Sequence, residues 1–138
     1  MSENGQSRAF LSAEDDPPLL YIFADELEAD GCLEKFQPVM PGDAVEQMGA
    51  IEGSFDIVYD DIDKHGYPDA WRAARERVRV GGLYICDNVL WSGRILEPEP
   101  DRNTSAILEH NQLIAEDERF VSTIVPTRDG VIVAVRIA

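Results

Sequence analysis

Residues Phe55–Arg94 read FDIVYDDIDKHGYPDAWRAARERVRVGGLYICDNVLWSGR, and this stretch decides the fold. Two apolar runs, Phe55–Tyr59 and Leu83–Cys86, each end in acidic or amide residues, and a helical pattern lies between them. A strand–helix–strand unit of this kind is right-handed, and its two strands run parallel. In open α/β sheets, ligands bind beyond the carboxyl ends of the strands. We therefore expect the functional site among the polar residues that follow the two runs.

Proline and glycine punctuate the rest of the chain. Pro68 opens the helix between the two strands, and Gly81-Gly82 is expected to close it. Asp129-Gly130 lies between two β-rich runs, which is typical of a hairpin. The expected elements, in chain order, are a helix at 19–30 (or, alternatively, a strand at 19–23), a short strand at 37–40, a helix at 44–50, strands at 55–59 and 83–86 around the central helix, a helix at 101–117, and hairpin strands at 120–126 and 130–137.

The polar, acidic N-terminus shows no periodicity, so we expect residues 1–18 to form a loose tail and residues 19–138 to form one domain. Twelve basic and 27 acidic residues give a net charge of −15, which disfavours nucleic acid and anionic membranes as partners. No apolar run reaches the length of about 20 residues that a membrane helix needs. Cys32 and Cys86 lack metal or redox spacing, so we expect free thiols and a cytoplasmic protein.

The residues after the two apolar runs suit a hard divalent cation. Oxygen ligands of the kind that Mg²⁺ or Ca²⁺ prefers occur at four positions: Asp61, Asp63, Asp87 and Asn88. Lys64 could place an amine beside the ion, where it is a candidate general base. The alternative is that these side chains only cap turns and helices, as Asp and Asn often do after strands. His65 and His110 stand alone and are interpreted as surface or capping residues.

Three segments carry a family resemblance: FDIVYDDIDK (55–64), GGLYICDNVLWSGR (81–94) and IVPTRDGV (124–131). They resemble the cation-dependent O-methyltransferases, the family of the catechol and caffeoyl-CoA O-methyltransferases. The resemblance runs from about Glu26 to Ala138. It implies an α/β, Rossmann-like fold, namely the C-terminal portion of a class I methyltransferase, with a mostly parallel sheet and a terminal antiparallel hairpin. Asp60 departs from the family, which has an apolar residue there.

The resemblance also implies residue roles. The metal ligands would be Asp61, Asp87 and Asn88. Contacts to S-adenosylmethionine would come from Asp43, Ala44, Asp61 and Asp63. Lys64 would deprotonate the acceptor, a small hydroxylated, catechol-like molecule whose hydroxyl a divalent cation, Mg²⁺ by expectation, makes more acidic. The oxyanion would then lie in line with the methyl group of the donor.

The chain departs from the family upstream of Gly42, where no glycine-rich cofactor turn is found. The resemblance is thus to an N-terminally truncated family member. One edge of the strand Phe55–Tyr59 would then be bare, and bare edges invite pairing. We expect either a homodimer or assembly through that edge, or an N-terminus that folds over it. Two alternatives to an active enzyme stay open: a catalytically incomplete binding or subunit protein, and a truncated reading frame.

Overall fold

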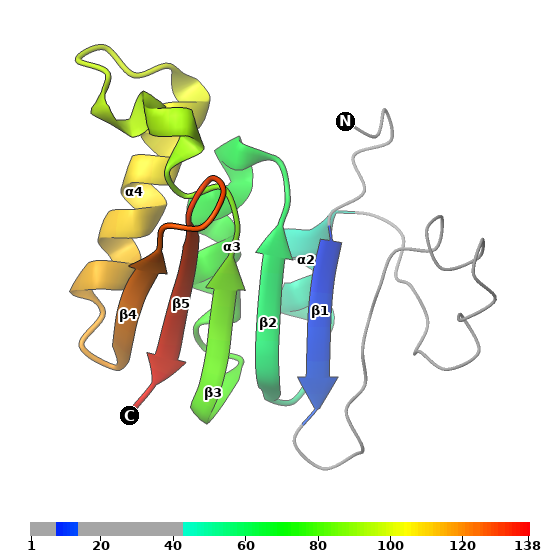
Figure 1. Cartoon of the computed structure of the whole chain (residues 1–138). Coiled ribbons are helices and arrows are strands. Elements are labelled where there is room, and N and C mark those ends of the chain that lie inside the picture. Colours follow the sequence, from blue (N-terminus) through cyan, green and yellow to red (C-terminus); the bar gives the residue numbers. More distant parts are fainter. Residues whose placement is uncertain (1–7, 14–42) are drawn as a thin grey trace, which may run out of the picture.

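The computed structural model describes residues 8–13 and 43–138. In this part of the chain, five strands form one sheet in the order β1-β2-β3-β5-β4 (Figure 1). Strands β2 and β3 are parallel, and the other three neighbouring pairs are antiparallel. The elements are β1 (Arg8–Ala13), α2 (Ala44–Ala50), β2 (Phe55–Asp61), the 3-10 helix η2 (Lys64–Gly66), α3 (Tyr67–Ala74), β3 (Val78–Cys86), the 3-10 segment η3 (Trp91–Leu96), α4 (Arg102–Glu116), β4 (Phe120–Val125) and β5 (Val131–Arg136).

Helices α2, α3 and α4 lie on one face of the sheet, behind it in Figure 1, and the other face carries no helix among the described residues. The core lies between these two layers. Trp71 of α3 is fully buried, and its ring meets those of Tyr84 and Phe120 edge-on, at centroid distances of 4.9 Å and 4.8 Å. Such aromatic pairs stabilise a core beyond the area they bury. The Trp71 cluster therefore ties α3 to β3 and β4.

Most of the predicted elements in the described part are confirmed. Helix α2 has the predicted bounds, and the Asp43 carboxylate caps it by accepting hydrogen bonds from the amides of Val45 and Glu46. Asp101 caps α4 in the same way, through the Thr104 amide at 2.8 Å. The terminal hairpin of β4 and β5 is antiparallel, as predicted. Capping side chains satisfy amides that a helix start leaves unpaired, so the two carboxylates stabilise the starts of α2 and α4.

The expected role of Gly81-Gly82 is wrong. Helix α3 already ends at Ala74, and both glycines lie inside β3, which begins at Val78. Gly81 has a φ of +80°, and the β2–β3 register shifts beside it, between Phe55 and Ile57. A Cβ on Gly82 would lie 2.9 Å from the backbone oxygen of Asp56 on β2. The two glycines therefore permit an irregularity in β3 and a close approach between the β2 and β3 backbones.

The expectation of a loose N-terminal tail is wrong for residues 8–13. These residues form β1, which pairs antiparallel with β2 from Arg8 opposite Asp61 to Ala13 opposite Phe55. The edge of β2 is therefore covered by the N-terminus, which was the second of the two expectations for that edge. Because β1 covers this edge, the reason for expecting assembly through it no longer holds. The oligomeric state stays a prediction.

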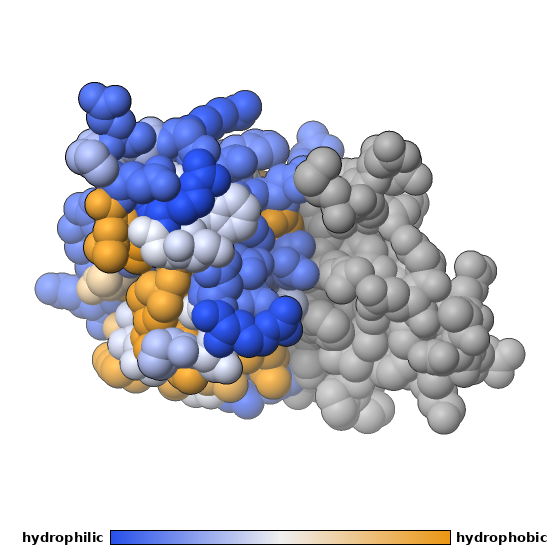
Figure 2. Space-filling model, turned by 45° about the horizontal axis from the view of Figure 1, so that its top comes forward, coloured by the Kyte–Doolittle hydropathy of each residue, from blue (hydrophilic) through white to orange (hydrophobic). Residues whose placement is uncertain are grey.

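The α/β class and the terminal antiparallel hairpin are confirmed, and the β2–β3 pair is the parallel part of the sheet. The helix or strand expected near 19–30, the strand at 37–40 and the domain boundary at residue 19 lie outside the described residues. From the side that brings the top of Figure 1 forward, hydrophilic residues dominate the described surface, with hydrophobic patches between them (Figure 2). No helix in the described residues is long and apolar enough to cross a membrane.

Candidate functional site

The carboxyl ends of β2 and β3 bring Lys64 together with Asp61 and Asn88, two of the three predicted metal ligands. Lys64 opens η2 just after β2, and its Nζ donates a 2.9 Å hydrogen bond to Oδ1 of Asn88, just after β3. The same Nζ lies 3.9 Å from Oδ1 of Asp61. The Lys64 side chain is 13% exposed and that of Asp61 is 31% exposed, so this cluster borders solvent. Parallel strands end at the same edge of a sheet, and this is why residues 24 positions apart meet.

Tyr67 and Trp91 lie next to Lys64 on two other sides. The Tyr67 hydroxyl accepts a 2.5 Å hydrogen bond from Lys64 and donates a 2.8 Å bond to the main-chain oxygen of Asp87. Burial raises the pKa of Tyr67, which keeps the phenol neutral. The Lys64 Nζ also lies 5.7 Å from the centre of the Trp91 ring. The lysine is thus positioned between the two strand ends.

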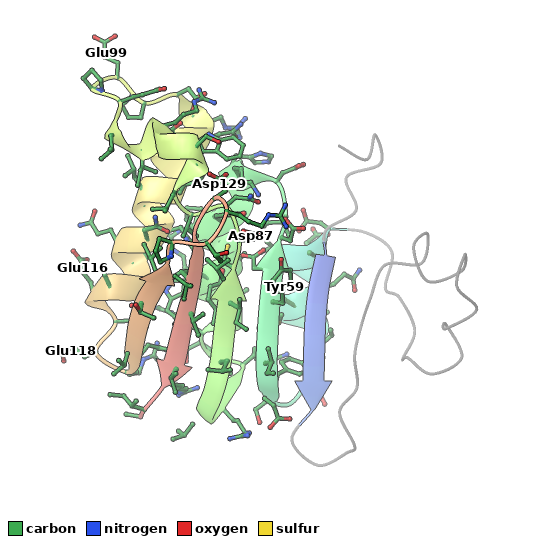
Figure 3. All side chains as sticks on the ribbon, in the orientation of Figure 1. Tyr59, Asp87, Glu99, Glu116, Glu118 and Asp129 are labelled. Carbon is green, nitrogen blue, oxygen red and sulfur yellow. The ribbon has the colours of Figure 1, made fainter. Side chains whose placement is uncertain are left out.

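The turn of the terminal hairpin completes the cluster. Asp129 accepts a 3.4 Å hydrogen bond from the Asn88 amide group and another from the Ser92 main chain. Figure 3 places Asp87 and Asp129 together at the upper end of the sheet, away from the acidic residues at the foot of α4. Asn88 has a φ of 60°, a left-handed conformation that is uncommon outside glycine. Backbone strain of this kind concentrates at functional sites.

The predicted cofactor residues fall into two places. Asp61 belongs to the cluster, and Asp63 is exposed at the start of η2 with its carboxylate unused as a cap. Asp43 and Ala44 lie at the start of α2, where the Asp43 carboxylate caps the helix. The structure thus places the predicted base beside Asp61 and Asn88, whereas the Asp87 carboxylate accepts a 2.7 Å hydrogen bond from the Asn88 main-chain amide and the α2 residues lie apart. Sequence reasoning missed Tyr67 and Asp129, although the hairpin signal at Asp129-Gly130 pointed to a turn there.

A second polar cluster lies inside the core, directly below these strand ends. The Tyr84 hydroxyl donates a 2.7 Å hydrogen bond to Oδ2 of Asp60 and lies 3.0 Å from Nε2 of His110. Asp60 is 4% exposed, and the other two are fully buried. The interpretation of His110 as a surface or capping residue is therefore wrong, because α4 turns it inward beside Tyr84. Cys86 is buried as expected, next to this group.

Burial dominates the electrostatics of the inner cluster. It raises the pKa of Asp60 to about 6, although the hydrogen bond from Tyr84 acts in the opposite direction. It lowers the pKa of His110 to about 4. It raises the pKa of the Cys86 thiol well above its ordinary value. Burial is the largest cause of all three shifts, since a low-dielectric interior disfavours the charged form of each group.

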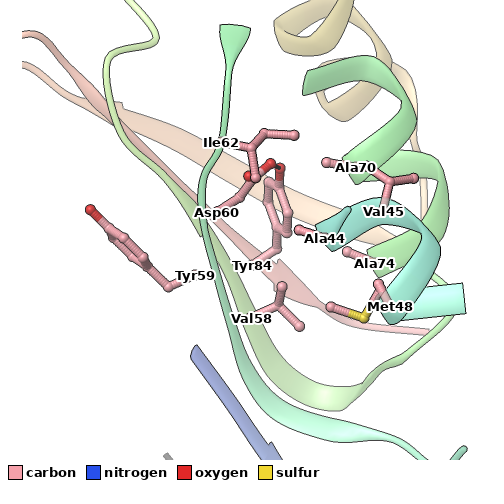
Figure 4. Close-up of a pocket in the computed structure, with 10 residues that line it drawn as sticks. All are labelled: Ala44, Val45, Met48, Val58, Tyr59, Asp60, Ile62, Ala70, Ala74 and Tyr84. Carbon is pink, nitrogen blue, oxygen red and sulfur yellow. Dashed lines mark hydrogen bonds between the residues drawn. The ribbon is translucent and has the colours of Figure 1, made fainter. Parts of the chain in front are cut away.

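A narrow cavity of about 20 Å³ reaches the inner cluster between α2, α3 and β2. Its walls are mostly apolar, and its polar end is formed by Asp60 and Tyr84 (Figure 4). In the same view the Tyr59 ring points away from the other lining residues. Ala44 lies on the α2 side of this cavity. The α2 start and the buried polar group therefore share one small space.

Fold and site together define an α/β protein whose candidate ligand residues gather at the carboxyl edge of a parallel strand pair. A family model described as O-methyltransferase matches residues 29–137. The chain therefore belongs to this O-methyltransferase family.

Curated relatives agree with this assignment. Caffeoyl-CoA O-methyltransferase 1 of Eucalyptus globulus is 35% identical over 95 residues, covering 63% of this chain and 38% of the relative. Caffeoyl-CoA O-methyltransferase 2 of Populus trichocarpa is 33% identical over 110 residues, covering 72% of this chain and 44% of the relative. The chain thus spans less than half the length of these relatives.

Solved structures share the fold. The O-methyltransferase from Bacillus cereus in complex with SAH is 28% identical, with a TM-score of 0.71 over 80% of this chain and 54% of that one. The O-methyltransferase TomG from Streptomyces achromogenes, in complex with SAM, has a TM-score of 0.72 at 21% identity. That match covers 81% of this chain and 54% of TomG, and it supports the fold alone.

Proposed function

We propose that this chain takes part in methyl transfer from S-adenosylmethionine to a hydroxyl of a small, catechol-like acceptor, with a divalent cation, Mg²⁺, at the carboxyl ends of β2 and β3. The observation that carries the proposal is the convergence of Lys64 Nζ on Asn88 Oδ1, at 2.9 Å, and on Asp61 Oδ1, at 3.9 Å. A candidate base and two candidate ligands from separate strands share one small volume there.

The residues present fit a hard cation. Asp61 and Asp87 provide carboxylates and Asn88 an amide oxygen, which are the ligand types that Mg²⁺ takes, usually alongside several waters. Asn88 Oδ1 already accepts a hydrogen bond from an ammonium group, so this oxygen is turned toward positive charge. Asp129 binds the Asn88 amide nitrogen and thereby fixes which end of that side chain faces Lys64. Asp61, Asp87 and Asn88 would hold the ion.

The chain's own residues would position the acceptor and move its proton. When bound, the cation supplies Lewis acidity to the acceptor hydroxyl and S-adenosylmethionine supplies the methyl group. In its neutral amine form, Lys64 would accept the hydroxyl proton at Nζ, which lies 2.9 Å from Oδ1 of Asn88 and 3.9 Å from Oδ1 of Asp61. Tyr67 would keep that nitrogen in place through its hydroxyl, which is anchored on the main chain of Asp87. The Trp91 ring would exclude water from one side of the lysine.

Asp63, Asp43 and Ala44 are the candidate contacts to S-adenosylmethionine outside the metal cluster. Asp63 is exposed and unused as a cap, so its carboxylate is available to a ligand near the cluster. Asp43 and Ala44 would border the adenine, by the resemblance alone. Residues 43–138 contain no glycine-rich cofactor turn. The Bacillus cereus O-methyltransferase, which is 28% identical, was solved in complex with SAH, and this supports S-adenosylmethionine as the donor here.

Calorimetric titration of S-adenosylmethionine into the folded chain, with Mg²⁺ present, tests the proposal. One-site saturable binding that weakens in Asp63→Asn is the expected result. No heat at millimolar cofactor, from a chain that circular dichroism reports as folded, would exclude independent catalysis.

A second candidate function is that of a binding or subunit protein that keeps the cation cluster and relies on another chain for the cofactor. The lack of a glycine-rich cofactor turn in residues 43–138 favours it. Mg²⁺ binding without S-adenosylmethionine binding would be its signature. The cytoplasmic location, the acceptor and the oligomeric state stay predictions under both functions.

A further inference from the structure

We propose that Asp60, Cys86 and His110 form a second metal site, which takes a borderline-soft divalent ion such as Zn²⁺ and is distinct from the Asp61–Asp87–Asn88 cluster. One ligand atom from each of the three side chains lies within 4.8 Å of the others, and all three residues are buried. They come from β2, β3 and α4.

The strand register explains how two of the ligands meet. Asp60 and Cys86 are direct partners in the parallel β2–β3 pair. Their side chains therefore lie next to each other on one face of the sheet, the face that the helices cover. Asp61 follows on β2 and points to the opposite side. The proposed inner site and the candidate Mg²⁺ cluster thus lie at the same strand ends but use alternate residues.

The donor set selects the ion. A carboxylate, a thiolate and an imidazole together suit Zn²⁺, whereas Mg²⁺ and Ca²⁺ take oxygen ligands only. In a tetrahedral zinc site, bonds of about 2.0–2.3 Å place ligand atoms about 3.3–3.8 Å apart. The metal-free spacing of up to 4.8 Å would therefore contract by about 1 Å.

Tyr84 lies beside two of the proposed ligands, Asp60 and His110. Its hydroxyl already bonds Oδ2 of Asp60 and lies 3.0 Å from Nε2 of His110. His110 is held by Asn111, whose Oδ1 lies 3.0 Å from Nδ1 and whose amide nitrogen donates to the main chain of Val89. This leaves Nε2 as the ligand nitrogen. Such an outer hydrogen bond is the usual way in which a metal-binding histidine is oriented.

The cavity between α2, α3 and β2 gives the site an approach. Its volume of about 20 Å³ accommodates one water-sized particle, and its polar end is formed by Asp60 and Tyr84 (Figure 4). An ion bound there would link three elements that are far apart in sequence. Because the ligands assemble only in the folded chain, binding would raise the unfolding temperature, and the thiol proton of Cys86 would be released to solvent.

Cobalt substitution tests the site directly. Co²⁺ is titrated into the full chain after chelator treatment, with Mg²⁺ in excess to fill the oxygen cluster. The expected result is one equivalent of Co²⁺ bound, with a thiolate-to-cobalt charge-transfer band in the near ultraviolet and the intense visible bands of a tetrahedral ion. Zn²⁺ should erase both and raise the unfolding temperature. A folded wild-type chain without the charge-transfer band overturns the proposal.

Variants locate the thiolate. The band should vanish in Cys86→Ser and persist in Cys32→Ser, the matched change at the other cysteine. It should also persist in Asp87→Asn, which alters only the oxygen cluster. If Cys86→Ser does not fold, Cys86→Ala removes the thiol without adding a buried hydroxyl. A band that disappears in Cys32→Ser, or weakens as Mg²⁺ increases, would place the cobalt elsewhere and contradict the inner site.

Discussion

Nζ of Lys64 lies 2.9 Å from Oδ1 of Asn88, so the candidate base and a candidate metal ligand are joined by one hydrogen bond. A cation and an ammonium group would compete for this amide oxygen. Binding of Mg²⁺ to Asn88 would release Nζ toward the acceptor. The arrangement therefore couples the state of the ion site to the availability of the base.

Replacing Lys64 with Met should separate these two effects. Mg²⁺ should bind more tightly, because the competing ammonium is gone, while methyl transfer should fall by about 10²–10⁴-fold, the usual contribution of a general base. Calorimetry and a methyl-transfer assay measure the two quantities. Lys35→Met, at the other lysine, is the control and should change neither. Weaker Mg²⁺ binding in Lys64→Met would show that the lysine supports the ion site and does not compete with it.

Asp61→Asn should weaken Mg²⁺ binding by about tenfold or more, equivalent to at least about 1.4 kcal/mol, because a hard ion loses a charged ligand. Asp69→Asn is a matched change on α3, where Asp69 pairs with Arg72 at an exposed position. It should leave the Mg²⁺ affinity unchanged. Equal affinities for the two variants would remove Asp61 from the site.

The hairpin turn that orients Asn88 depends on Gly130. Gly130 and Gly53 both have positive φ values, of 79° and 94°, but an added Cβ at Gly130 would collide with the Leu90 side chain, whereas at Gly53 it meets nothing. Gly53→Ala should lower the free energy of unfolding by about 1–2 kcal/mol, for backbone strain alone. Gly130→Ala should add about 1–3 kcal/mol for the clash and should also weaken Mg²⁺ binding. Chemical denaturation and calorimetry test this, and equal losses in the two variants would contradict it.

The inner cluster predicts an unusual dependence of stability on pH. In the folded chain the pKa of Asp60 is raised from 3.8 to about 6. Its contribution to the free energy of unfolding is therefore fully present below pH 3.8 and is lost as the pH rises through about 6. In the folded chain the pKa of His110 is lowered from 6.5 to about 4. Its contribution to the free energy of unfolding is therefore fully present above pH 6.5 and is lost as the pH falls through about 4. The two contributions, each on the order of 3 kcal/mol at most, oppose each other over one pH range. The metal-free wild type should therefore show a weak slope there.

Single variants should expose each contribution. In Asp60→Asn the free energy of unfolding should rise with pH between about 4 and about 6.5, where His110 alone acts. In His110→Asn it should fall with pH between about 4 and about 6, where Asp60 alone acts. Urea denaturation across this range, in the presence of chelator, gives both slopes. Slopes of the same sign in the two variants would contradict the assignment.

The sequence was most informative where local chemistry decides structure. The predicted starts of α2 and α4 agree with the structure to within one residue, and Asp43 and Asp101 cap the two helices there. Asp61 and Asn88 were recognisable as site residues because each follows an apolar run. Gly81-Gly82 misled, since a glycine pair serves a strand irregularity as readily as a helix end. Only the close approach of the β2 backbone to this glycine pair distinguishes a strand irregularity from a helix end.

Features that depend on distant contacts could not be predicted. Residues 8–13 form a strand because they pair with the edge of β2. The polar residues around this short segment show no periodic pattern that would predict a strand. His110 is buried because α4 packs its inner face on Tyr84, 26 residues away, so its isolation in the sequence said nothing about its partners. Tyr67 joins the site only through Lys64 and the Asp87 main chain. Each of these is a tertiary effect.

A methyl-transfer assay with labelled S-adenosylmethionine, Mg²⁺ and a catechol acceptor, using the full chain, tests directly whether this chain is an active methyltransferase. We expect a methylated product that disappears with chelator and in Lys64→Met, and that is retained in Lys35→Met. A folded chain that binds Mg²⁺ yet forms no product over a broad panel of catechols would contradict an active methyltransferase. That result would leave a cation-binding subunit as the function of this chain.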